Sequence, residues 1–224
     1  MTRLRPTGRR PALAGLLQSP LLPPGRPLWR VSQLLVGLVL YGVSDAMVVV
    51  SGLGVEPWDA LSQGLSRTVG LTIGIWTNLI GAAVLLLWIP LRQKPGLGTL
   101  CNVLIVGTSM DVTLALVAGP DALWLRWTLL IAGIVLNGFA TGCYLGAQAG
   151  PGPRDGLMTG LASRGHRLWA VRWGIELTVL AIGFLLSATI GIGTLLYAFG
   201  IGPLVNFFIP LLDMDRRKRS SARQ

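Results

Sequence analysis

Charged residues, cysteines and histidines are scarce in this sequence. Only 12% of the 224 residues are charged and 52% are hydrophobic, whereas soluble globular proteins carry about 25% charged residues. Too few polar side chains remain to cover a globular surface, so we expect lipid to cover much of the chain. The two cysteines, Cys101 and Cys143, both lie within apolar runs. This placement argues against a disulfide-rich secreted scaffold and favours two buried thiols.

Signatures of common enzymes and metal sites are also missing. The sequence contains no P-loop, GxSxG or HExxH pattern, and its one histidine, His166, lies in an arginine-rich segment. We therefore expect no enzyme activity, no cofactor and no metal site, with an intramembrane enzyme as a weaker alternative. The net charge of +10 would favour nucleic-acid binding in a soluble protein. Here the basic residues cluster beside apolar runs, so we expect no nucleic-acid partner.

Six segments are long and apolar enough to cross a bilayer as helices. A hydrocarbon core about 30 Å thick requires about 20 such residues, and the segments cover 31–51, 71–91, 97–118, 124–146, 168–187 and 192–212. The sequence therefore predicts an all-α membrane protein with six transmembrane helices. Residues 1–28 are rich in proline and arginine, which predicts a disordered basic tail. Residues 214–224 predict a second basic tail.

The distribution of lysine and arginine predicts the orientation of these helices. If the N-terminus is cytoplasmic, all of the 19 basic residues except Arg67 and Arg126 fall on the cytoplasmic side. Such an excess is typical of cytoplasmic segments. We therefore expect a multi-pass protein of the inner (plasma) membrane with both termini in the cytoplasm.

An internal repeat divides the membrane part into two halves, 29–118 and 119–213. A shift of 96 residues aligns Pro57 with Pro153 and Asp59 with Asp155, and a shift of 95 aligns Gly96–Thr99 with Gly191–Thr194 and Gly107 with Gly202. Each half contributes three transmembrane helices, and an odd number gives the two halves opposite orientations. Inverted repeats of this kind recur in transporters and channels.

Each half also contains a segment in which glycines precede a Pro-x-Asp sequence. Pro57 and Pro153 suit the first position of a helix, and the acid two residues later complements the positive helix N-terminus. Each helix would be about 18 Å long, which is too short to cross the membrane. We expect both to be re-entrant, with their N-termini facing a central site. A pair of interfacial turns is the alternative.

Three acidic residues, Asp45, Asp111 and Glu176, lie within the predicted transmembrane helices. An aspartate at such a position costs about 2.5–3.5 kcal/mol, and acids there are candidates for function. Glu176 could instead pair with Arg172 one turn earlier. Asn78, Asn102, Asn137 and Asn206 are expected to form interhelical hydrogen bonds. The candidate pathway residues are Asp45, Glu56, Pro57, Asp59, Asp111, Pro153, Arg154, Asp155 and Glu176.

Four segments carry a family resemblance. Residues 54–64, 88–99, 150–160 and 190–194 together resemble the bacterial YczE/YitT-type integral membrane proteins, over roughly 31–212. The Pro-Arg-Asp-Gly sequence at 153–156 is the most specific part, and Val55 replaces a smaller residue. The resemblance implies a bacterial inner-membrane location and no particular activity.

Two functions follow from these patterns. The first is a secondary transporter or channel for a small polar or anionic solute. The second is a non-transporting scaffold or regulator whose basic tails bind a protein partner or anionic lipid. Expected partners are membrane lipid, a small polar solute and, in a homo-oligomer, further copies of the chain.

Overall fold

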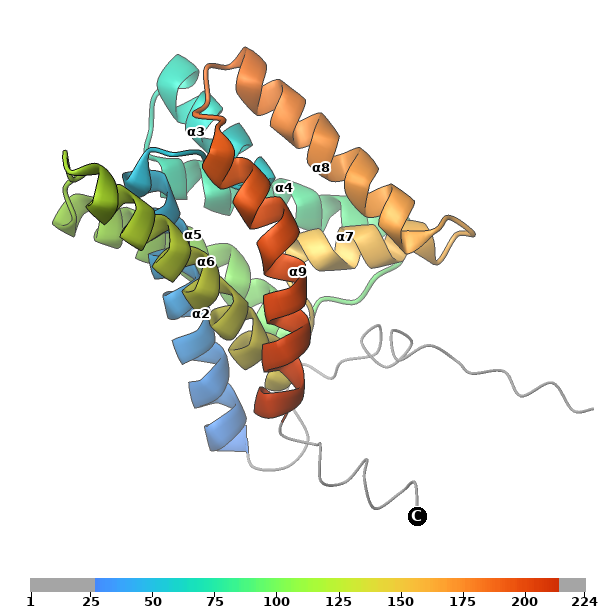
Figure 1. Cartoon of the computed structure of the whole chain (residues 1–224). Coiled ribbons are helices and arrows are strands. Elements are labelled where there is room, and N and C mark those ends of the chain that lie inside the picture. The colour runs from blue at the N-terminus through green and yellow to red at the C-terminus, as the bar shows by residue number, and fades with distance from the viewer. Residues whose placement is uncertain (1–26, 214–224) are drawn as a thin grey trace, which may run out of the picture.

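The computed structural model describes residues 27–213 and contains only helices and connecting segments within that range (Figure 1). Six helices are long and apolar enough to cross a membrane, which confirms the predicted fold class. They are α2 (Pro27–Ser51), α4 (Ile73–Leu91), α5 (Leu97–Leu116), α6 (Leu123–Gly146), α8 (Leu168–Leu185) and α9 (Ile192–Leu212). Two shorter helices are α3 (Pro57–Val69) and α7 (Pro153–Ala162). The predicted tails lie outside the described residues, except that α2 begins at Pro27, two residues inside the first tail.

The two short helices begin where the sequence predicts. Pro57 and Pro153 lie in the first turn of α3 and α7, where a missing N–H leaves no hydrogen bond unmade. Gly70 ends α3 with a φ of 91°, and Gly165, with a φ of 103°, follows α7. Both glycines adopt a backbone conformation that other residues rarely tolerate.

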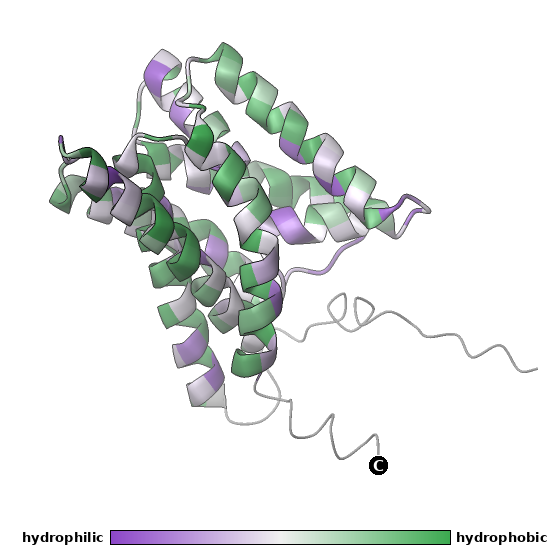
Figure 2. Ribbon diagram, viewed as in Figure 1, coloured by the Kyte–Doolittle hydropathy of each residue, from purple (hydrophilic) through white to green (hydrophobic). Residues whose placement is uncertain are grey.

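Large apolar side chains cover the outer faces of the long helices. Leu86, Leu104, Phe184 and Phe199 are each at least 65% exposed, and hydrophobic residues dominate the long helices in Figure 2. Monomeric soluble proteins rarely expose contiguous apolar surface on this scale. These faces therefore fit contact with lipid.

The halves are joined by α2 and α6, which pack along each other in opposite directions. Arg30, near the start of α2, donates a hydrogen bond to the carbonyl of Ala147, just after α6. Arg126, near the start of α6, donates to the carbonyls of Ser51 and Gly52 at the end of α2. The 96-residue shift aligns these two arginines. Each one satisfies terminal carbonyls of the partner helix, which otherwise lack intrahelical donors.

Each short helix packs on the other half of the chain. Helix α3 lies against α8, and α7 lies against α4. The contacts are close, because a Cβ at Gly156 would meet the ring of Trp88 on α4, and a Cβ at Gly183 on α8 would meet the backbone of Ala60. The two halves are therefore interlocked around their short helices.

The segments before α3 and α7 pair with the start of the last helix in the other half. The amide of Gly193 donates to Leu53 O at 2.9 Å, and the amide of Gly98 donates to Ala149 O at 2.8 Å. These two bonds are equivalent under the repeat and anchor both short helices at their N-terminal ends.

The halves differ in how their last two helices pack. Helices α4 and α5 lie against each other, with Gly74 and Gly107 so close that a Cβ on either would meet backbone of the other. Within the described residues, α8 and α9 do not pack along each other. Gly202 on α9, the repeat equivalent of Gly107, faces open space.

Candidate functional site

A cavity of about 320 Å³ lies where the N-terminal ends of α3 and α7 meet. Pro57 and Pro153 both line it, together with polar residues of α5, α6 and α9. All three tyrosines of the chain, Tyr41, Tyr144 and Tyr197, lie on its wall. The wall therefore combines aromatic surface with hydroxyl and amide groups, a composition typical of small-molecule sites.

Glu56 and Arg154 connect the two short helices across this cavity. Glu56 is the residue before α3, Arg154 follows Pro153 in α7, and their side chains form a hydrogen-bonded ion pair. The guanidinium carbon also lies 5.2 Å from the centre of the Trp58 ring, within the range of a cation–π interaction. The sequence predicted Arg154 as a pathway residue on the cytoplasmic side, and the structure places it on the cavity wall, where α7 packs against α4.

Asp155 is held in place by hydrogen bonding on the α7 side of the cavity. Its Oδ2 accepts a hydrogen bond from the Tyr144 hydroxyl at 2.6 Å. The indole N–H of Trp88 donates to Pro153 O at 3.0 Å, and the Thr99 hydroxyl donates to Pro151 O at 2.7 Å. The start of α7 is therefore fixed by side chains of α4, α5 and α6.

A buried hydrogen-bond network connects the cavity wall to Asp45. Tyr197 donates to Asn137 Oδ1 at 2.9 Å, and Asn137 Nδ2 donates to Asp45 Oδ1 at 2.7 Å and to Ser44 Oγ at 3.0 Å. The interhelical role predicted for Asn137 is confirmed. The network joins α9, α6 and α2, which come from both halves.

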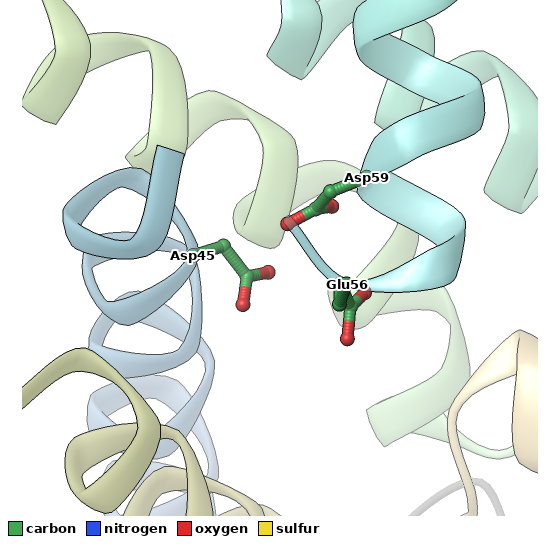
Figure 3. A group of neighbouring side chains, drawn as sticks. All are labelled: Asp45, Glu56 and Asp59. Atoms are coloured by element: carbon green, nitrogen blue, oxygen red, sulfur yellow. The ribbon is translucent and has the colours of Figure 1, made fainter. Parts of the chain in front are cut away.

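Asp45, Glu56 and Asp59 lie together beside this network (Figure 3). One carboxylate oxygen from each lies within 4.8 Å of the others, and all three residues are buried. Both oxygens of Asp59 and the Oδ2 of Asp45 lack a hydrogen-bond partner. The nearest cation, Arg154, comes within 3.9 Å of Asp59 Oδ1. The structure therefore brings together three of the predicted candidates from two consecutive helices, α2 and α3.

Two other predicted residues occupy different surroundings. Glu176 lines the cavity and accepts a hydrogen bond from Arg172 at 2.8 Å, so the expected ion pair is present. Asp111 is not among the cavity residues. It accepts from the amide of Gly74 at 2.8 Å and from the hydroxyl of Thr72, both at the start of α4. A carboxylate there satisfies free amides of the helix N-terminus, which gives Asp111 a structural contact.

Several residues of the site were not predicted from the sequence. The three tyrosines carry no motif, although their restriction to the predicted transmembrane helices was a usable signal. The contact of Glu56 with Arg154 joins residues 98 positions apart. The repeat aligns Glu56 with Gly152 and Trp58 with Arg154, so comparing the halves could not reveal the pair.

Comparisons with known proteins place this architecture in a family. An uncharacterized protein of Haemophilus influenzae is 42% identical over 183 residues, covering 81% of this chain and 84% of that protein. The uncharacterized membrane protein YczE of Bacillus subtilis is 32% identical over 195 residues, covering 83% and 90%. The uncharacterized protein YyaS of the same species is 32% identical over 183 residues, covering 80% and 91%.

No solved structure matches the chain. The resemblance to YczE seen in the sequence is confirmed. Residues 28–210 match the family of unknown function DUF6198, which includes all six long helices and both short ones. The chain is a multi-helix membrane protein that belongs to this family.

Proposed function

We propose that this protein is a secondary transporter for a small polar solute. The observation that carries the proposal is the central cavity, which is bordered by the N-terminal ends of two short helices and by polar side chains from both halves. Transporters commonly bind their substrates at such repeat interfaces, with the ends of interrupted helices facing the solute.

The size and charge of the cavity limit the solute. A volume of about 320 Å³ is at the lower end of the range for small-molecule pockets. Arg154 is paired with Glu56, and Arg172 with Glu176. An anionic group would therefore have to displace a carboxylate from an arginine. These contacts favour a small neutral or zwitterionic solute unless Glu56 first leaves Arg154.

The unequal packing of the halves supports alternating access. Helices α4 and α5 are closed against each other, while α8 and α9 are apart. If the halves are inverted, exchanging these two arrangements would move the opening of the cavity to the other side of the membrane. The antiparallel packing of α2 and α6 supports such an inversion. The basic residues support an inner-membrane location with cytoplasmic termini.

Cysteine labelling would test this proposal without knowledge of the solute. In a background of Cys101→Ser and Cys143→Ala, Asn102→Cys places a thiol at the cavity wall, and Leu104→Cys places one on the apolar outer face of the same helix. Right-side-out and inside-out vesicles would be treated with a membrane-impermeant maleimide. We expect Asn102→Cys to react from both sides and Leu104→Cys from neither. A cavity thiol that reacts from one side only, or from neither, would contradict transport.

The scaffold alternative makes a different prediction. Removing residues 1–26 and 214–224 leaves the helices from α2 to α9 intact. A transporter should retain the labelling pattern and any cellular phenotype after this truncation. An adaptor that works through its basic tails should lose the phenotype while still folding and reaching the membrane.

A further inference from the structure

The three carboxyl groups of Asp45, Glu56 and Asp59 form a cluster that the solute cavity does not explain. Asp59 is 0% exposed, Asp45 1% and Glu56 5%. Figure 3 shows Asp45 on α2 and Asp59 on α3 pointing toward each other, with Glu56 beside them. Burial of ionised groups is costly unless they are paired or coordinate a metal.

The protein groups around the cluster leave three of its six carboxyl oxygens without a hydrogen bond. Asn137 donates to Asp45 Oδ1 only, and Arg154 hydrogen bonds to Glu56. Asp45 Oδ2 and both oxygens of Asp59 have no hydrogen-bond partner. Three carboxylates with one guanidinium carry a net charge of −2. A ligand that supplies two positive charges would neutralise the cluster.

The internal repeat indicates that the fold itself does not require these acids. The residues equivalent to Asp45, Glu56 and Asp59 in the second half are Thr141, Gly152 and Asp155. There the single carboxylate is satisfied by the hydroxyl of Tyr144. The same helix junction therefore forms with one partnered acid, and the extra, unpartnered acids of the first half call for a ligand.

We propose that Asp45, Glu56 and Asp59 bind one divalent cation of the hard, oxygen-preferring class. Their oxygens lie within 4.8 Å of one another, which lets all three reach a single ion at the distance of about 2.3–2.6 Å typical of Ca²⁺–oxygen contacts. The set contains no histidine or cysteine, so zinc and copper are disfavoured. The sequence alone predicted no metal site, because the spacing of Asp45, Glu56 and Asp59 matches no metal-binding motif and the angle between α2 and α3 is set by the fold.

A cation at this position would also connect to the cavity through Glu56. The carboxylate of Glu56 is the hydrogen-bonding partner of Arg154 and also lines the cavity. If the cation draws Glu56 away, the guanidinium becomes available to an anionic group of a solute. This coupling rests on the proposed transport function, whereas the cation site does not.

Cation binding can be measured on the purified full-length protein without any solute. After treatment with EDTA, the protein would be heated in a choline chloride buffer with Ca²⁺, Mg²⁺, Mn²⁺ or Na⁺, and its unfolding temperature recorded. Bound Mn²⁺ would also be counted by electron paramagnetic resonance. We expect a saturable rise in unfolding temperature with a divalent ion, because a ligand that binds only the folded state stabilises it. Na⁺ should have no such effect.

Three variants distinguish binding at the proposed ligands from nonspecific effects of the cation on stability. Asp59→Asn should abolish the shift and the bound Mn²⁺, yet unfold at or above the temperature of the metal-free wild type, because it removes a buried charge that has no hydrogen-bond partner. Asn137→Ala removes the donor that orients Asp45 and should weaken the apparent affinity by about 10–100-fold. Asp121→Asn, which changes an exposed acid, should bind as the wild type does.

Two results would overturn the proposal. The first is that no divalent ion stabilises the wild type, or that only Na⁺ does so. The second is that Asp59→Asn binds Mn²⁺ as well as the wild type, which would place the ion elsewhere. A failure of cysteine labelling would refute transport but leave the cation measurements unaffected, so the two proposals fail independently.

Discussion

Replacing Arg154 with methionine removes the one cation among residues 27–213 that pairs with the buried acids Glu56 and Asp59. The guanidinium hydrogen bonds to Glu56 and lies 3.9 Å from Asp59 Oδ1. Its side chain is 19% exposed and that of Glu56 is 6% exposed, so solvent screens the pair only in part. Removing one partner of a buried ion pair costs about 3–5 kcal/mol. We therefore expect Arg154→Met to be destabilising by about this amount.

The matched variant Glu56→Gln should cost less. It keeps the guanidinium, which can still interact with Asp59, and it removes one of the three negative charges. The double variant Glu56→Gln/Arg154→Met should be more stable than Arg154→Met alone. Neighbouring residues show coupling energies of about 0.5–3 kcal/mol in such cycles.

The assay is unfolding of the purified protein by SDS in mixed micelles, followed by tryptophan fluorescence. All variants would be measured in the presence of EDTA, so that cation binding does not contribute. If Arg154→Met is destabilised no more than Glu56→Gln, and the second substitution gives no recovery, the electrostatic reasoning is wrong.

Two further predictions use the same assay. Gly107→Ala would place a Cβ against the carbonyl of Gly74 and should destabilise the protein by about 1–3 kcal/mol. Gly202→Ala on α9 adds a Cβ in open space and should change stability little. Equal effects would contradict the closer packing of α4 on α5 than of α8 on α9. Arg126→Gln removes two hydrogen bonds to the terminal carbonyls of α2 and should lower the free energy of unfolding by about 1.5–3 kcal/mol. An unchanged stability would show that water hydrogen bonds to these carbonyls in place of the arginine.

The elements of the fold could be predicted because their signals are local. A run of about 20 apolar residues specifies a transmembrane helix, and the six long helices match the predicted segments to within a few residues. Proline at the first helical position specifies where α3 and α7 begin. The ion pair of Arg172 with Glu176 follows from their spacing of one helical turn.

The site could be predicted only as a set of isolated candidates. The sequence identified Asp45 as a costly intramembrane acid and Asp59 as an acid at a helix start. It could not place their carboxyl groups together, because the relative orientation of the consecutive helices α2 and α3 is set by the packing of α2 on α6 and of α3 on α8. Asp111 is an acid within a predicted transmembrane helix, as Asp45 is, yet its carboxylate accepts a hydrogen bond at the start of α4.

The sequence by itself determined the six long apolar helices and the two short ones, and it predicted an internal repeat. Each of these features depends on composition or spacing within one segment, or on similarity between two. Only the tertiary structure decided which acids share a site and that Arg154 pairs with Glu56. The ion pair depends on a contact between residues 98 positions apart. The acid cluster depends on how α2 and α3, which are consecutive in the chain, pack against α6 and α8 of the other half.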